Sequence, residues 1–226
     1  MPAPVEAAAS TPRTSPWPTV LWGLLAVLAW DLSGLDVPLA QWVGGPNGFP
    51  WQFHPVLSNV MHQAARTLGW VVLWGLTLLA IWPLGPLKRL TPRERAGLVG
   101  SVWTALVVVV VLKGISRTSC PWDLEVFGGA ARYVSHWAWG QLDGGPGGCF
   151  PAGHASTGFA FVAAHFWLKP THPSLARRWM WVALATGALL GISQQMRGAH
   201  FMSHTLWTVW LCWSLGAVLW HLTHRK

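Results

Sequence analysis

Long apolar runs, separated by short polar stretches rich in proline and glycine, dominate the pattern along this chain. Six of them approach the roughly 20 residues that a helix needs to cross a hydrocarbon core of about 30 Å. They cover residues 17–35, 66–82, 96–116, 153–169, 177–193 and 201–222. The pattern predicts an all-α polytopic membrane protein with six transmembrane helices.

Glycines inside these runs indicate how the helices meet. Gly23, Gly75, Gly187 and Gly216 each stand within an apolar segment. Small residues let membrane helices approach one another closely, so we expect helix contacts at these positions.

The chain ends define the domain organisation. Residues 1–16 are rich in proline and small residues and predict a disordered cytoplasmic tail. The next apolar run shows no clear small-residue cleavage site, so we interpret it as an uncleaved first span. Residues 17–226 then form one six-helix membrane domain.

Composition and charge agree with this interpretation. The chain has 52% hydrophobic and only 10% charged residues, which excludes an ordinary soluble domain. Ten lysines and arginines fall on one side of the six spans and five on the other, so the positive-inside rule places both termini in the cytoplasm. The net charge of +8 fits a basic face against anionic lipid, and we expect no nucleic-acid partner.

Candidate chemistry gathers on the outer side. Three stretches meet there, "LKGISRTSCPWDL", "CFPAGHAS" and "SQQMRGAHFMSH". Their cations and imidazoles are Lys113, Arg117, His154, Arg197, His200 and His204. Such a set favours an anionic substrate, and phosphate suits the paired donors of arginine.

These stretches resemble the motifs of the type 2 phosphatidic acid phosphatase superfamily, six-helix membrane enzymes that cleave lipid phosphates through a phosphohistidine. The family pattern is a lysine, six residues, then Arg-Pro; Pro-Ser-Gly-His; and Ser-Arg, five residues, His, three residues, Asp. The residues that match it are Lys113, Pro121, Pro151, Gly153, His154, Ser193 and His200. Four positions depart from it: Cys120 and Gln194 replace arginines, Ala152 replaces the serine and His204 replaces the aspartate.

The resemblance implies a role for each side chain. His200 would be the nucleophile, His154 the acid that protonates the leaving oxygen, and His204 the partner of the nucleophile. Because a neutral histidine adds no negative charge, Asp123 or Asp143 could assist. Lys113, Arg197, Arg117 one helical turn after Lys113, and backbone amides near Ala152 and Gly153 would bind the phosphate.

The activity implied is that of a lipid phosphatase that needs no metal or cofactor. It would hydrolyse a phosphate monoester or diphosphate of a membrane lipid. The expected location is a bacterial inner membrane, with multiple spans, cytoplasmic termini and a periplasmic active site.

Other functions remain open on the sequence alone. The phosphate could pass to a second lipid instead of water. His200 and His204 have the i, i+4 spacing of zinc ligands, with His154 as a third, and histidines on facing helices could bind haem. We expect a structural role for His165. His62 and Arg66, one turn apart, could contact substrate, although we favour a structural role for them too.

The cysteines leave one further question open. Cys120 and Cys149 both lie in the outer loop between the third and fourth spans, next to the first and second motifs. In an oxidising compartment they could form a disulfide that pins this loop, or they could remain free thiols.

Overall fold

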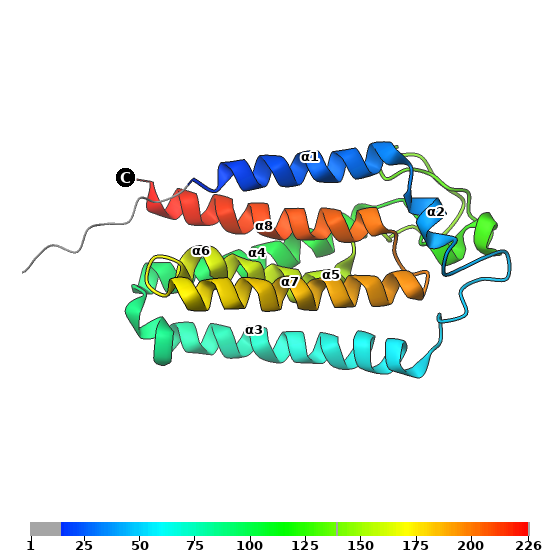
Figure 1. The fold of residues 1–226 in the computed structure, drawn as a ribbon. Coiled ribbons are helices and arrows are strands. Elements are labelled where there is room, and N and C mark those ends of the chain that lie inside the picture. Colours follow the sequence, from blue (N-terminus) through cyan, green and yellow to red (C-terminus); the bar gives the residue numbers. More distant parts are fainter. Residues whose placement is uncertain (1–14, 139, 226) are drawn as a thin grey trace, which may run out of the picture.

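The computed structural model describes residues 15–138 and 140–225, and these contain helices but no strand. The long helices are α1 (Trp17–Ser33), α3 (Ala65–Ile81), α4 (Pro92–Ile115), α7 (Pro173–Met196) and α8 (Met202–His224). They lie side by side in one bundle, with the start of α1 and the end of α8 at the same end (Figure 1). The predicted all-α class is confirmed. Residues 1–14 of the predicted tail lie outside the described ranges.

Shorter elements complete the bundle. A π-helix, η1 (Val56–Ala64), runs directly into α3. Another continuous run consists of α5 (Gly153–Phe159), η5 (Ala160–Ala163) and α6 (Ala164–Leu168). The remaining short helices are α2 (Asp36–Ala40), η2 (Gly85–Arg89), η3 (Pro121–Asp123) and η4 (Glu125–Phe127). Each predicted apolar run therefore coincides with helix, although the fourth changes its helical type along its length.

Local signals in the sequence fix several helix ends. Thr91 caps α4 by accepting a hydrogen bond from the Glu94 amide at 3.2 Å, while the Glu94 carboxylate accepts one from the Thr91 amide. Pro92 and Pro173 stand at the first positions of α4 and α7, where a missing N–H is harmless. Gly34 ends α1 in the left-handed conformation, with φ of 65°.

Three described helical segments are long and apolar enough to cross a membrane: Val56–Arg89, Pro92–Ile115 and Met202–His224. Trp17–Ser33 is apolar but shorter. Many large apolar side chains point outward, among them Leu32, Trp74 and Val110. An exposed apolar surface of this kind suits lipid rather than water, which indicates a membrane protein.

Close helix contacts occur at three of the four glycines noted in the sequence. A Cβ on Gly187 of α7 would overlap the Phe159 ring of α5, and one on Gly158 would overlap the Gly187 backbone. Gly216 and Gly23 also meet neighbouring helices closely. The expectation is wrong for Gly75, because nothing lies within 4 Å of a Cβ built there.

The end of the bundle opposite the start of α1 and the end of α8 carries α2 and the loop between α4 and α5 (Figure 1). A small apolar core lies there, formed by Phe49, Leu124, Phe127, Ala131 and Phe201. A disulfide joins Cys120 to Cys149, which confirms one of the two states that the sequence left open. The disulfide and this core hold the loop between α4 and α5 against the ends of α7 and α8.

Candidate active site

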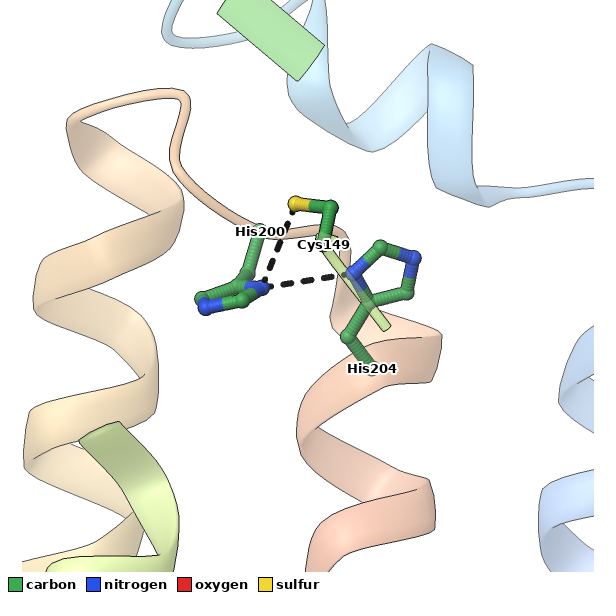
Figure 2. A group of neighbouring side chains, drawn as sticks. All are labelled: Cys149, His200 and His204. Atoms are coloured by element: carbon green, nitrogen blue, oxygen red, sulfur yellow. Dashed lines mark hydrogen bonds between the residues drawn. The ribbon is translucent and has the colours of Figure 1, made fainter. Parts of the chain in front are cut away.

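Two buried histidines stand at the junction of α7 and α8. His200 lies in the connecting loop and His204 in the first turn of α8, exposed by only 3% and 1%. Their Nδ1 atoms are 3.3 Å apart, within hydrogen-bonding distance, so one ring donates and the other accepts. The second nitrogen of His200 points away from this contact (Figure 2). His200 is therefore oriented by its Nδ1 and keeps Nε2 for other partners.

The disulfide contacts this pair directly. Cys149 Sγ lies 3.5 Å from Nδ1 of His200, on the side away from Nε2 (Figure 2). Burial lowers the pKa of His200 well below its ordinary value, and the nearby charges of Lys113, His204 and His154 lower that pKa further. The His200 imidazole is consequently neutral at physiological pH.

His154 stands in the first turn of α5, opposite the π-helix that precedes α3. Its ring stacks on His62 with 3.8 Å between ring centroids. Its Nε2 is buried and has no hydrogen-bond partner among the described residues. An unpaired buried nitrogen is unfavourable unless a ligand pairs with it. His62, for which we expected a structural role, thus lies within the candidate site.

The charges that act on His154 are all positive. They come from Lys113, Arg66 and Arg197, together with the imidazole of His62. Arg197 is held in place by its hydrogen bonds, from Nε to the Gln52 carbonyl at 2.9 Å and from Nη1 to the Gln194 side chain at 3.2 Å. With no carboxylate among these groups, the region favours an anion.

Lys113 and Arg117 line a separate cavity of about 440 Å³, together with residues 145–148 of the glycine-rich loop. The expectation that they sit one helical turn apart is wrong, because α4 ends at Ile115 and Ser116 is extended. Arg117 is exposed, and no histidine lines this cavity within the described chain. Lys113, whose charge also acts on His154 and His200, connects the two regions.

The backbone before His154 differs in part from expectation. Gly153 begins α5, as the phosphate-binding interpretation requires. A Cβ built on Gly153 would lie 3.5 Å from Cδ of Lys113, so the Lys113 side chain passes close to this helix start. The Ala152 amide, however, donates to the His204 carbonyl at 3.2 Å and is not available to a phosphate. That bond ties the start of α5 to α8.

The acids proposed to assist His204 have other partners. Asp143 accepts hydrogen bonds from the Ser119 amide and hydroxyl, and Asp123 accepts one from the Cys120 amide. Among the described residues, the hydrogen bonds of both carboxylates therefore stabilise the loop that carries the disulfide. The reason is that loop amides need acceptors, which nearby carboxylates supply.

A different acid reaches the neighbourhood of His204. Asp31 of α1 lies 3.3 Å from Nε2 of His136, whose ring is 6.2 Å from that of His204. Burial lowers the pKa of His136, and Asp31 opposes that shift. Neither Asp31 nor His136 was among the site residues predicted from the sequence. The available signal was an aspartate inside an apolar span, which is a costly placement that usually has a specific partner.

The comparisons with known proteins decide the family. The family model of the PAP2 superfamily matches residues 96–226, more than half of the chain. The chain belongs to the PAP2 superfamily. No curated protein and no solved structure matches it significantly. Membership confirms the resemblance drawn from the motifs and supports a phosphatase-type hydrolase acting on phosphate esters.

The residues that could bind zinc in this PAP2 protein differ from the three histidines suggested by the sequence. Among the described residues, the group close enough to hold a metal ion is Cys149, His200 and His204, and it does not include His154. While Cys149 is in the disulfide its sulfur is not a thiolate, so two imidazoles alone would face an ion. The oxidised protein therefore lacks the three ligands of a typical zinc enzyme.

Proposed function

We propose that this PAP2 protein removes phosphate from a membrane lipid at the outer face of the membrane, through a phosphohistidine intermediate. The observation that carries this proposal is that two imidazoles and several cations are close enough for their charges to act on one another. The charges of Lys113 and His154 act on His200, and those of Lys113, Arg66 and Arg197 act on His154. His200 is neutral and oriented, and His154 has a buried nitrogen with no partner among the described residues.

The reaction begins with attack on phosphorus by Nε2 of His200. His204 orients the ring through the Nδ1 contact and accepts the Nδ1 proton as positive charge develops on His200. The bond from phosphorus to the lipid oxygen breaks, and His154 donates a proton from Nε2 to that oxygen. Water, deprotonated by His154, then attacks the phosphohistidine and releases inorganic phosphate.

The cations supply binding and electrostatic stabilisation. Arg197 is the best placed, because Gln52 and Gln194 fix its guanidinium, whose charge acts on His154. Gln194 stands at a position where the family pattern has arginine, so Arg197 takes over the charge from one turn further along. Lys113 contributes from α4, and the bound phosphate favours the protonated form of His154.

An apolar cavity supports a lipid as the carrier of the phosphate. It has a volume of about 260 Å³ between α3, α5 and α7 and is lined by residues such as Leu68, Val72, Phe161 and Thr186. Thr157 and Gly158, one turn after His154, also line it. A hydrocarbon chain lying there would leave its phosphate beside His154.

The topology we propose has six spans, with α5, η5 and α6 together forming the fourth. Both termini would be cytoplasmic and the active site would open to the periplasm of a bacterial inner membrane. The disulfide at the loop end of the bundle supports this orientation, because disulfides persist in oxidising compartments.

Phosphate release from a panel of phosphorylated lipids tests the proposed function. We expect His200→Ala to reduce kcat to background and His154→Ala to reduce it by about 10²–10⁴-fold, the usual contribution of general acid–base catalysis. His172→Ala is the matched control, since this histidine lies at the turn before α7, away from the site. Equal turnover by wild type and both site variants would refute the proposal.

A further inference from the structure

The disulfide sulfur of Cys149 and the histidine pair also form a group of potential metal ligands. Cys149 Sγ, His200 Nδ1 and His204 Nδ1 face one another, and all three ligand atoms lie within 4.8 Å (Figure 2). All three side chains are almost fully buried. They come from two separate parts of the chain, the residues just before the second motif and the junction of α7 and α8.

The spacing of these atoms matches zinc coordination. Tetrahedral zinc, with Zn–N of about 2.0–2.1 Å and Zn–S of about 2.3 Å, holds neighbouring ligand atoms roughly 3.3–3.6 Å apart. The observed separations are 3.3 Å between the two Nδ1 atoms and 3.5 Å between Sγ and Nδ1 of His200. A thiolate and two imidazoles are also ligand types that zinc prefers.

We propose that reduction of the Cys120–Cys149 disulfide creates a zinc site formed by Cys149, His200 and His204, and that zinc bound there inactivates the enzyme. The inactivation, unlike the zinc site itself, rests on the proposed role of His200 as nucleophile.

The redox step requires a dithiol reductant. Two electrons from the dithiol break the Cys120–Cys149 bond, each cysteine receives a proton, and the dithiol leaves as a disulfide. Zinc then binds Cys149 as a thiolate and releases the thiol proton, while both imidazoles bind in the neutral form. A water completes the tetrahedron.

Zinc would abolish the nucleophilicity of His200 by fixing the tautomer of its ring. Both Nδ1 lone pairs must point at the metal, so both rings carry their proton on Nε2. In the absence of zinc, Nε2 of His200 is the atom that we expect to attack phosphorus. A protonated Nε2 has no lone pair for that attack.

Two single variants separate this proposal from simple loss of the disulfide. Cys120→Ser and Cys149→Ser break the same bond, but only Cys120→Ser leaves a thiol next to His200 and His204. Zinc content of the purified full-length protein is measured after equilibration with zinc and removal of excess. We expect about one zinc per chain in Cys120→Ser and none above background in Cys149→Ser, following the ligand requirement of such sites.

Cobalt substitution identifies the ligands independently of activity. Cobalt in Cys120→Ser should give a thiolate charge-transfer band and the visible bands of a tetrahedral site, and adding His204→Phe should remove both. Wild type reduced with a phosphine should behave like Cys120→Ser, which covers the case in which a variant folds poorly.

The zinc content of the two cysteine variants and of the reduced wild type decides whether the zinc site exists. Equal zinc content in the two cysteine variants, together with no zinc uptake by reduced wild type, would overturn it. Phosphate release by the oxidised wild type is measured separately, so failure of the phosphatase assignment would be recognised on its own. Zinc uptake without loss of phosphate release would overturn the inactivation.

Discussion

His200 shows how burial prepares a side chain for chemistry. Its ring is almost fully enclosed, and both burial and the charge of Lys113 lower its pKa. The neutral ring is the form that the proposed attack on phosphorus requires, and at physiological pH His200 is in that form. His204 orients the ring without adding negative charge, which fits a nucleophile that is positioned more than it is activated.

The lowered pKa of His200 predicts the acid limb of the pH profile. Protonation inactivates His200, and it occurs only when the pH falls through a pKa below the ordinary value of about 6.5. We therefore expect kcat/KM to be maintained as the pH falls to about 6.5 and to decline below it. Initial rates on one lipid phosphate across a pH series measure this. A decline centred above 6.5 would contradict the assignment of His200.

Arg197 gives a second prediction for a single residue. Arg197→Ala removes a guanidinium fixed by Gln52 and Gln194. A charged hydrogen bond contributes about 1.5–3 kcal/mol, so kcat/KM should fall by about 10–100-fold. Arg132→Ala is the control, because this outer-loop arginine is exposed. Similar losses in both variants would indicate a general effect of positive charge and not a phosphate contact.

At the scale of the helices, packing between α5, α7 and α8 positions His154 and His200. His154 stands on α5, and α5 packs on α7 where Gly158 meets Gly187 and Gly187 meets Phe159. The Ala152 amide ties the same helix to α8 through the His204 carbonyl. The disulfide fixes the preceding loop. The two imidazoles that we propose as catalytic are thus aligned by contacts that take no part in the proposed reaction.

Gly158→Ala tests this alignment. Its Cβ would overlap the Gly187 backbone, and overpacking of this kind costs about 1–3 kcal/mol. We expect a lower unfolding temperature in detergent and reduced phosphate release. Gly75→Ala is the matched control, since its Cβ meets nothing within 4 Å. Equal unfolding temperatures of the two variants would show that the α5–α7 contact has room for a methyl group.

At the scale of the whole molecule, the bundle combines a polar site with an apolar surface. Arg197 directly follows α7 at the end of the bundle that carries α2, and the cavity between α3, α5 and α7 begins one turn away from His154. Large apolar side chains cover the outer faces of α1, α3 and α4. This arrangement suits a substrate whose phosphate leaves the bilayer while its chain remains within it.

The cavity makes a prediction about substrate choice. Thr186→Trp would fill the space beside α5, so we expect KM for a long-chain lipid phosphate to rise while hydrolysis of a short, soluble phosphate ester is unchanged. Ala185→Trp is the matched control, because this neighbour is also exposed on α7 but does not line the cavity. Parallel changes on both substrates, or in both variants, would argue against a chain-binding cavity.

The sequence by itself determined the helices, the family and most of the candidate chemistry. Apolar runs of membrane length can satisfy their backbone hydrogen bonds as helices, so their positions follow from composition. The match to the family motifs selected Lys113, His154 and His200, because residues of one motif keep a fixed spacing along the chain; the roles of these residues stay predictions.

Only the tertiary structure decided which side chains meet. His62 against His154, Asp31 against His136, and Cys149 against His200 join parts of the chain that are far apart in sequence. No local pattern encodes such pairs, since they depend on how the helices pack and where the loops fold back. For the same reason Asp123 and Asp143, plausible partners by charge alone, proved to bind loop amides instead.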